Sequence, residues 1–422
     1  MQSSDMRLPL SGIRVVDSTN SWAGPFSAQI LASFGAQVIK VEAIQYLDTW
    51  RTSATAYGPQ DTIWERSPTW NSVNSGKLGI TLNLQNPKGV DLFKRLVKIS
   101  DVVAENFSPR VMRNFGLNYE VLKEVNPEII MISLPAYGNS GPWSSFVGFA
   151  ASIEQMAGFP SLTGYPDGPP KMSGAGFTDA ISGVTASVAL MTALIHRQMT
   201  GKGQYIELAQ MEANTSLIGD AIVEYAMNGK NPPRRGNRHP WAAPHGCYRS
   251  LGEDQWVNLA VYTDEQWQKF CHITGHPEWA EDARFAGGIA RWKHQDELDK
   301  MIEEWTMRHD HYEIMHLLQQ EGIAAGAVLS GAELLSDPHL KERHAFEVLE
   351  RDIVGAHPYP VAAAAMRLSG SEPRLERPAP TLGQHNDYVL GELLGLTKDE
   401  IKTLEEENII GDMPLGQVKG RA

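Results

Sequence analysis

One aspartate is the residue best placed to do chemistry. Asp179 follows two glycines, Gly174 and Gly176, and the next twenty residues are almost uncharged and form a helical pattern. An aspartate at or just before a helix start is a preferred N-cap, worth ~1 kcal/mol. The same position favours the ionised carboxylate, which could act as a nucleophile. Residue types alone leave both roles open, and capping is the commoner one.

The other short motifs do not match known catalytic signatures. The stretch 174–179 has an aspartate where a dinucleotide fingerprint needs its third glycine, so a negative charge would face the pyrophosphate. Gly201-Lys202-Gly203 lacks the Ser or Thr that follows the lysine of a P-loop. The histidines form no HExxH motif, no serine lies in a G-x-S-x-G elbow, and Cys247 and Cys271 are not in a CxxC spacing. We therefore expect no NAD site, no P-loop and no metal site.

Short apolar runs alternate with helical patterns along the first half of the chain. Such alternation favours βαβ units, a mostly parallel sheet and an α/β fold. The expected strands cover residues 12–17, 36–42, 78–84, 101–105, 129–133 and 205–208. The expected helices cover residues 26–34, 86–99, 119–124, about 179–199 and 211–227.

Changes in residue composition along the chain suggest the domain boundaries. A stretch rich in Pro, Gly, Asn and Arg begins at Gly229 and is typical of a linker. A strand from Trp256 then leads into several helices with Pro and Gly turns between them, which indicates a smaller α+β domain. We divide the chain into a large domain, a linker, a small domain and a C-terminal part with a second linker, covering residues 1–228, 229–255, 256–325 and 326–422.

The composition is that of a globular protein with an acidic balance. Of 422 residues, 42% are hydrophobic and 21% are charged, and the formal net charge is −13. Because there is no Lys- or Arg-rich run, nucleic-acid binding is disfavoured, although one local anionic ligand is not. The most apolar window, residues 184–195, is shorter than the ~20 residues that span a bilayer. The N-terminus lacks the regions of a signal peptide. We expect a cytoplasmic protein without nucleic-acid or membrane partners.

A longer pattern extends over nearly the whole chain. Its stretches are residues 10–17, 23–25, 31–42, 101–107, 200–204, 264–267, 322–326 and 382–385. In this order they resemble the class III CoA-transferases, the group of formyl-CoA transferase and carnitine CoA-transferase, which also includes α-methylacyl-CoA racemases. The likeness is specific for the family and only weakly specific for a substrate.

The resemblance implies both a fold and a mechanism. The fold is a Rossmann-like large domain without dinucleotide binding and a smaller domain. A C-terminal segment returns to the large domain, and two chains interlock as a dimer. The family's catalytic aspartate falls on Asp179. Its carboxylate would attack a donor acyl-CoA thioester, giving a mixed anhydride and then an aspartyl-CoA thioester, before an acceptor acid takes the CoA.

The resemblance also implies contacts to coenzyme A, which is a substrate, and it implies no prosthetic group. Lys40 matches a basic residue near the nucleotide, and the loop from Asn74 to Lys77 would line the adenine. Asn106 and Phe107 would flank the pantetheine and adenine, and Arg113 would reach the phosphates. Local cations of this kind are what an anionic ligand needs in an acidic chain.

Three departures from the family's patterns bear on the reaction. Gly148-Phe149-Ala150 stands where the racemases have Gly-His-Asp, so no imidazole is present to exchange an α-proton. Trp22 replaces the glutamine of formyl-CoA transferase, and the stretch 239–246 replaces its run of glycines. Formate and oxalate are therefore disfavoured. Trp22 suggests a larger, partly apolar acid, unless it is simply a core residue.

Two alternatives to a CoA-transferase remain. One is an acyl-CoA racemase or isomerase that uses Asp179 with another base. The other is a non-catalytic subunit of a transferase built from unlike chains, although the presence of Asp179 argues against it. We expect a homodimer that binds an acyl-CoA and a small carboxylic acid, with a hetero-oligomer as the alternative. The sequence does not name the donor or the acceptor acid.

Overall fold

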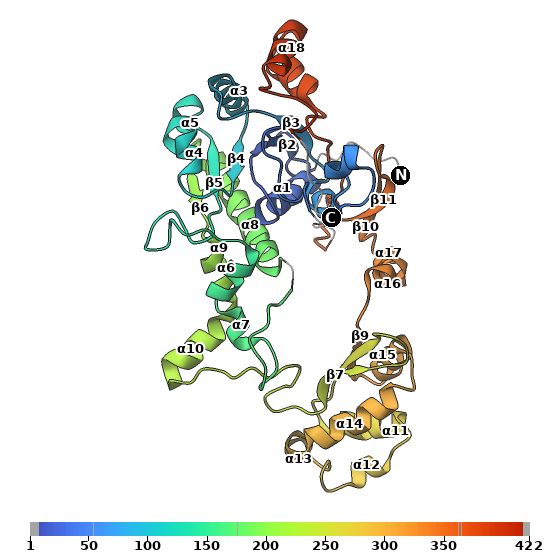
Figure 1. The fold of residues 1–422 in the computed structure, drawn as a ribbon. Coiled ribbons are helices and arrows are strands. Elements are labelled where there is room, and N and C mark those ends of the chain that lie inside the picture. Colours follow the sequence, from blue (N-terminus) through green and yellow to red (C-terminus); the bar gives the residue numbers. More distant parts are fainter. Residues whose placement is uncertain (1–7, 54, 175, 362, 364, 417–422) are drawn as a thin grey trace. The chain divides into compact units, whose positions relative to one another are not determined.

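The computed structural model describes residues 8–53, 55–174, 176–361, 363 and 365–416. The chain forms two compact units, which are described separately below (Figure 1). The large unit consists of Met1–Phe159, Ser173–Asn228 and Pro338–Ala422. The small unit consists of Pro160–Met172 and Gly229–Asp337. The chain therefore leaves the large unit and later returns to it.

A six-stranded parallel sheet forms the centre of the large unit. Its order is β3-β2-β1-β4-β5-β6, and every neighbouring pair is parallel. The strands are β1 (Arg14–Asp17), β2 (Gln37–Glu42), β3 (Leu78–Thr81), β4 (Val102–Glu105), β5 (Ile130–Ser133) and β6 (Tyr205–Glu207). The order reverses between β1 and β4, and Rossmann-type sheets bind ligands beyond the carboxyl ends of their strands at such a switch point. The expected Rossmann-like α/β fold is confirmed.

Helices cover both faces of this sheet because successive side chains of each strand point to opposite faces. Val15 packs in one apolar layer and Val16 packs in the other. The layer with Val15 contains the helices α1 (Ala23–Ser33) and α8 (Phe177–Thr200). The layer with Val16 contains α3 (Pro87–Lys98), α4 (Val111–Asn114), α5 (Tyr119–Val125), the π-helix η3 (Asp387–Leu393) and α18 (Lys398–Glu406).

Shorter elements complete the large unit. They are η1 (Gln60–Glu65), α2 (Pro68–Asn74), α6 (Ala150–Met156), α9 (Gln210–Thr215), η2 (Ser216–Ile218), α10 (Gly219–Asn228), α17 (Pro338–Glu342) and the antiparallel strands β10 (Phe346–Arg351) and β11 (Gly355–Pro360). The short helix α7 (Phe159–Leu162) lies where the chain passes from one unit to the other. The region expected to form one helix over 211–227 is split into α9, η2 and α10.

The C-terminal segment is an integral part of the large unit. The backbone N–H of His385 donates to the Gly79 carbonyl at 2.8 Å, and the Gly79 N–H donates to Nδ1 of His385 at 3.0 Å. The buried Arg351 pairs with the buried Glu65, and it also donates to the Ala379 carbonyl at 2.9 Å. These contacts join the C-terminal segment to Gly79 of β3 and to Glu65.

The small unit has its own core. A three-stranded antiparallel sheet of β7 (His245–Arg249), β8 (Trp256–Ala260) and β9 (Ala324–Ala327) packs against helices. The helices of this unit are α11 (Asp264–Ile273), α12 (Glu278–Glu281), α13 (Gly288–Lys293), α14 (Gln295–Thr306), α15 (His311–Gln320) and α16 (Gly331–Ser336). The stretch 229–255, expected as a linker, thus contains a strand of this sheet.

Helix α8, which carries Asp179, is long and apolar. Among the described residues it is the one helix that is long and apolar enough to cross a membrane, a test that buried core helices also pass. Half of the apolar window is buried inside the chain. A Cβ on Gly183 would lie 2.8 Å from the Ala23 carbonyl oxygen, so α8 and α1 approach each other closely. Helix α8 therefore belongs to the layered core of the large unit.

Candidate active site

Asp179 lies in the first turn of α8 and is buried. The helix begins at Phe177, and the N-cap is Gly176, whose φ of 83° lies in the left-handed region that favours glycine. The interpretation of Asp179 as the N-cap is therefore wrong, because the glycine before the helix takes that position. The carboxylate instead projects from the turn where free backbone N–H groups favour a negative charge. Its residue is only 8% exposed.

Three neighbouring elements hold this turn in place. A Cβ on Gly176 would lie 2.4 Å from the Trp22 ring, so the indole lies directly on the start of α8. Thr178 donates from Oγ1 to the Ala150 carbonyl at the start of α6 at 3.4 Å. The buried Asn214 of α9 donates from Nδ2 to the Thr178 carbonyl at 3.1 Å. Trp22 thus lies against Gly176, three residues before Asp179 in the chain. Ala175 lies outside the described residues.

Asp179 has a raised pKa because it is buried. Burial raises its pKa to about 6 from an ordinary value of 3.8. No Lys, Arg or His among the described residues forms an ion pair with it. At pH 7 such a group is ionised about ten to one, given that one pKa unit is a factor of ten. The arrangement supplies a carboxylate that is ionised and poorly solvated, which is the state a carboxylate nucleophile requires.

At the switch point of the sheet, Asn20 and Asn106 are joined by two hydrogen bonds. The Asn20 N–H, in the loop after β1, donates to Oδ1 of Asn106 at 2.7 Å. Asn106, in the loop after β4, returns a 2.7 Å hydrogen bond from Nδ2 to the Asn20 carbonyl. Phe107 is half-buried and its ring packs on the apolar layer of α3 and α5. Asn106 and Phe107 therefore lie where a doubly wound sheet binds its ligand.

Lys40, Asn74 and Lys77 lie inside the large unit. All three are fully buried. Nζ of Lys77 contacts Oδ2 of Asp17 at 2.8 Å and Oδ1 of Asn74 at 2.9 Å. Nζ of Lys40 donates to the Thr19 carbonyl. Both ammonium groups contact internal oxygens in this structure, and their contact with CoA stays a prediction.

This internal network shifts the pKa values of its members. Burial alone would raise the pKa of Asp17, but the neighbouring Lys40 and Lys77 lower it to about 2. Burial lowers the pKa of Lys77 to about 8, against the attraction of Asp17. The Lys77–Asp17 pair joins the end of β1 to α2, because Lys77 also contacts Asn74. It therefore stabilises the loop after β1, which lies at the switch point.

Arg113 is the exposed cation of the six expected CoA contacts. It lies in α4 at the surface of the large unit. Its guanidinium is free to meet a phosphate from solvent, which distinguishes it from Lys40 and Lys77. The structure thus brings Asn106 and Phe107 to the switch point, leaves Arg113 at the surface and buries the other three.

The sequence analysis missed Glu105. This carboxyl group ends β4 and is buried, and burial raises its pKa to about 7. Its Oε2 accepts a 2.8 Å hydrogen bond from the Phe107 N–H, so it fixes the loop that carries Asn106 and Phe107. Its place directly before these two residues was visible in the sequence, but its burial was not.

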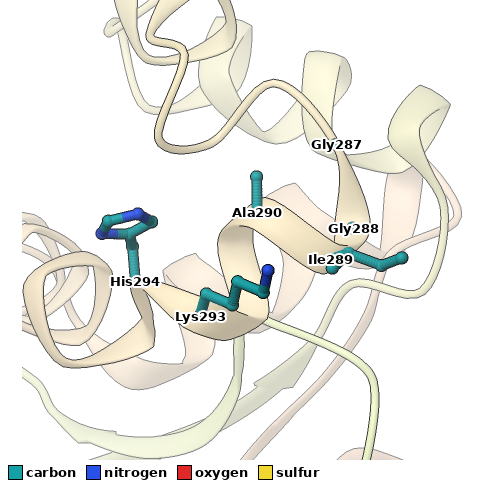
Figure 2. A pocket seen from close by; sticks show the side chains of 6 residues that line it. All are labelled: Gly287, Gly288, Ile289, Ala290, Lys293 and His294. Carbon is teal, nitrogen blue, oxygen red and sulfur yellow. The ribbon is translucent and has the colours of Figure 1, made fainter.

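The small unit contains an open pocket of about 470 Å³ (Figure 2). Its lining residues come from α13 and the turns beside it, and they are Gly287, Gly288, Ile289, Ala290, Lys293 and His294. The lining holds no carboxylate or thiol, so this pocket has no candidate nucleophile. Within the described part of the chain, no group of three His, Cys, Asp or Glu side chains could hold a metal ion.

Comparisons with known proteins agree on one family. The family model described as CoA-transferase family III matches residues 10–386. The chain is 34% identical to the succinyl-CoA–D-citramalate CoA-transferase of Chloroflexus aurantiacus, over 97% of this chain and 100% of that protein. It is also 34% identical to the succinate–glutarate CoA-transferase of Agrobacterium fabrum, over 91% of this chain and 96% of that protein. The crystal structure of a CAIB/BAIF family protein from Brucella suis matches with a TM-score of 0.84 and 33% identity, over 92% of this chain and 100% of that one.

Proposed function

Because the chain belongs to CoA-transferase family III, we propose that it moves CoA from a donor acyl-CoA to a free carboxylic acid with Asp179 as the nucleophile. The observation that carries this proposal is the buried carboxylate in the first turn of α8, without a paired cation among the described residues. A nucleophile held by a counter-ion would have to break that pair before attack. Asp179 has no such pair to break among the residues that the structure describes.

The proposed reaction consists of four acyl-transfer steps. The Asp179 carboxylate attacks the thioester carbonyl, which forms a mixed anhydride and releases CoA thiolate. The thiolate attacks the aspartyl carbonyl, which frees the donor acid and leaves an aspartyl-CoA thioester. The acceptor carboxylate attacks that thioester, giving a second anhydride and thiolate. The thiolate then attacks the acceptor carbonyl, and the new acyl-CoA leaves with Asp179 as a carboxylate again. Dividing one exchange into several acyl transfers lowers each barrier.

The surroundings of Asp179 suit this sequence of steps. All three intermediates are activated acyl groups, so water must be kept away from them. Thr178 and Asp179 are buried, and the Trp22 ring covers Gly176 at the start of the helix, so little solvent reaches the carboxylate. The backbone N–H groups at the helix start favour the negative charge that returns to Asp179 in the last step. The chain supplies the nucleophile and its shielding, and CoA supplies the thiol.

We propose short dicarboxylic acids as the substrate class. Two relatives at 34% identity are named for succinyl-CoA with D-citramalate and for succinate with glutarate. Each of these acids has two carboxylates joined by a short carbon skeleton. The Trp22 ring beside the α8 start offers an apolar face to such a skeleton. Formate and oxalate have no methylene group that could use this face.

Trapping the intermediate tests the proposal directly. The protein is incubated with succinyl-CoA and quenched with hydroxylamine, and peptides are mapped by mass spectrometry. A hydroxamate on Asp179 is expected, together with loss of CoA transfer in Asp179→Ala. Asp220→Ala is the matched control, because Asp220 also lies in the first turn of a helix, α10, but is exposed. Labelling confined to Cys247 or Cys271, or normal turnover of Asp179→Ala, would contradict the mechanism.

An acyl-CoA racemase or isomerase is the alternative from the same family. Such an enzyme would need a second group that exchanges the α-proton. Phe149, which stands at the position of the racemase histidine, has no titratable proton and is exposed just before α6. Incubation of a 2-methylacyl-CoA in D₂O distinguishes the reactions, since a racemase incorporates deuterium at the α-carbon and a transferase does not.

We further propose that the protein is a homodimer. Helix α10 has no buried residue, and its exposed apolar side chains are Ile222, Val223, Tyr225 and Met227. Helix α8 adds an exposed apolar row of Val184, Val188, Ile195 and Met199. Exposed apolar surface of this extent is typical of a subunit interface. Light scattering is expected to give about twice 46.6 kDa. Co-purification with an unlike chain would instead support a hetero-oligomer in which this chain is one subunit.

A further inference from the structure

Ser21 has an uncommon backbone conformation in the large unit. Its φ of 63° lies in the left-handed region, which residues other than glycine rarely adopt. The residue lies in the loop after β1, two positions before α1 begins. A conformation of this kind persists only where neighbouring groups hold it, and such positions are concentrated at functional sites. The groups that hold Ser21 therefore bear on the function of this loop.

The buried carboxylate of Asp48 holds Ser21 in this conformation. The Ser21 N–H donates to the two carboxylate oxygens of Asp48, at 3.3 and 3.2 Å. The hydroxyl groups of Ser21 and Thr49 are joined by a 2.7 Å hydrogen bond. Asp48 is itself fixed, because its Oδ1 accepts from the Trp50 N–H at 2.9 Å and its Oδ2 lies 3.6 Å from Nζ of Lys40. Both charged side chains are buried, so water does not compete for these contacts.

The residues before Ser21 are fixed as well. Asn20 exchanges two 2.7 Å hydrogen bonds with Asn106. The Thr19 N–H donates to Oδ1 of Asp17 at 3.0 Å. Because the loop is held up to this point, the backbone conformation of Ser21 sets the direction of the residue that follows it.

That residue is Trp22, the N-cap of α1. Its ring lies against Gly176, where an added Cβ would come within 2.4 Å of it. It also lies 6.3 Å from the Trp50 ring between centroids, in an edge-to-face arrangement. Gly176 is the N-cap of α8 and precedes Asp179 by three residues. The loop held by Asp48 therefore ends in a ring that covers the start of the helix carrying the candidate nucleophile.

We propose that Asp48 is a positioning residue for CoA transfer: its hold on Ser21 fixes the Trp22 ring over the start of α8, which keeps water from the acyl intermediates. The inference rests on the proposed function, in which Asp179 forms an aspartyl-CoA thioester. Asp48 acts through the backbone of the loop and not by contact with the reacting atoms. Its carboxylate is suited to this role, since it accepts hydrogen bonds from two backbone N–H groups of different segments.

Hydrolysis is the side reaction that this arrangement suppresses. When water attacks the aspartyl carbonyl of the Asp179–CoA thioester, a C–O bond forms, the C–S bond breaks and a proton of the water passes to the departing thiolate. The Asp179 carboxyl group and free CoA result. Because the donor acid left when the thioester formed, the net reaction is hydrolysis of succinyl-CoA to succinate and CoA. The ratio of hydrolysis to transfer therefore reports shielding, whereas a loss of folded enzyme lowers both rates alike.

The test measures this ratio in the full-length enzyme, with succinyl-CoA as donor and glutarate as acceptor. Asp48→Ala is expected to raise the ratio at least about 10-fold, since a misplacement of ~1 Å can change a rate about 100-fold. Asp48→Asn keeps an oxygen that accepts from the Ser21 N–H and is expected to change the ratio less. Asp101→Ala is the matched control and is expected to leave the ratio unchanged. Asp101 also accepts a backbone N–H, that of Arg14 at 2.7 Å, and pairs with Arg197, but it lies before β4 at the opposite end of the strands.

A second set of variants shows whether Asp48 acts through Trp22. Trp22→Ala is expected to raise the ratio as well, and Asp48→Ala is expected to add no further change in the Trp22→Ala background. Fluorine NMR of protein labelled with 5-fluorotryptophan gives a readout without turnover. The Trp22 resonance, assigned by its loss in Trp22→Phe, is expected to shift in Asp48→Ala and to stay in place in Asp101→Ala.

Circular dichroism and melting curves check that each variant is folded. If Asp48→Ala does not fold, Ser21→Val replaces it, because a β-branched residue disfavours the left-handed conformation without removing a buried charge. The inference is overturned if Asp48→Ala and Asp101→Ala change the ratio alike, if the effects of Asp48→Ala and Trp22→Ala are additive, or if the Trp22 resonance does not move. If the wild-type enzyme transfers no CoA while this resonance moves in Asp48→Ala alone, the proposed function fails and the hold of Asp48 on Trp22 stands.

Discussion

Replacing Asp179 with asparagine is expected to make the protein more stable while abolishing CoA transfer. Asparagine has nearly the shape of aspartate but has no charge and no nucleophilic carboxylate. The buried Asp179 has no paired cation among the described residues, so its ionised form is destabilised in the folded protein. Removal of that charge relieves a cost that the wild-type enzyme carries for its chemistry.

The pKa of Asp179 sets the size of this effect. Burial raises it to about 6 in the folded chain, from an ordinary value of 3.8. Between these two values the folded state binds more protons than the unfolded state, so stability falls as the pH rises. A shift of about two units at ~1.36 kcal/mol each gives an upper value of about 3 kcal/mol above pH 6. Since the asparagine amide also needs partners, we expect a net gain of about 1 to 3 kcal/mol at pH 7.

Urea unfolding at a fixed protein concentration measures this difference. Wild type and Asp179→Asn are compared from pH 4 to pH 8, which cancels the titration of all other groups. The variant is expected to be more stable at pH 7, with the difference shrinking to under ~1 kcal/mol at pH 4. Asp220→Asn, the exposed counterpart in α10, is expected to show no such gain. A difference independent of pH, or a less stable asparagine variant at pH 7, would refute the reasoning.

Three further predictions concern the residues around the site. Lys77→Met removes the ion-pair partner of the buried Asp17, so unfolding in urea at pH 7 is expected to show a loss of about 3–5 kcal/mol, and a loss under ~1 kcal/mol would contradict the buried pair. Gly176→Ala forces a Cβ to 2.4 Å from the Trp22 ring at a φ of 83°. It is therefore expected to lower Tm and kcat, and the added change Trp22→Ala is expected to recover part of the loss in melting experiments. Glu105→Gln is expected to raise stability at pH 8 but not at pH 4, because burial raises the folded pKa of Glu105 to about 7 from 4.5; equal effects at both pH values would contradict this.

Most of the large unit's sheet could be predicted from the sequence because its strands are short runs of apolar, mostly branched residues. β1, β2, β4 and β5 begin and end within two residues of their expected ends. The helix over 211–227 could not be predicted in detail, since nothing in its composition marks the break between α9 and α10. β7 was missed because it is a polar stretch, His245–Arg249, that pairs only through long-range contacts with β8.

The place of Asp179 near a helix start could be predicted, but its surroundings could not. Family resemblance and the uncharged helix pattern pointed to Asp179, whereas its burial and the contact between Trp22 and Gly176 join residues more than 150 positions apart. The N-cap interpretation failed for a related reason. A capping aspartate and a first-turn aspartate differ by three positions, and only the backbone of Gly176 shows which one is present.

The buried lysines show contacts that the local sequence does not predict. A basic residue in an acidic chain suggests an anionic ligand, but an internal carboxylate satisfies the same charge. Asp17 ends β1 and Lys77 comes just before β3, and the register aligns Asp17 with Lys40 and Lys40 with Gly79, so the start of β3 lies level with the end of β1. That pairing depends on strand order and register, which the local sequence does not contain. The lysines hold in place the loops around the switch point, so removing Lys77 is expected to weaken the fold before it weakens any contact with CoA.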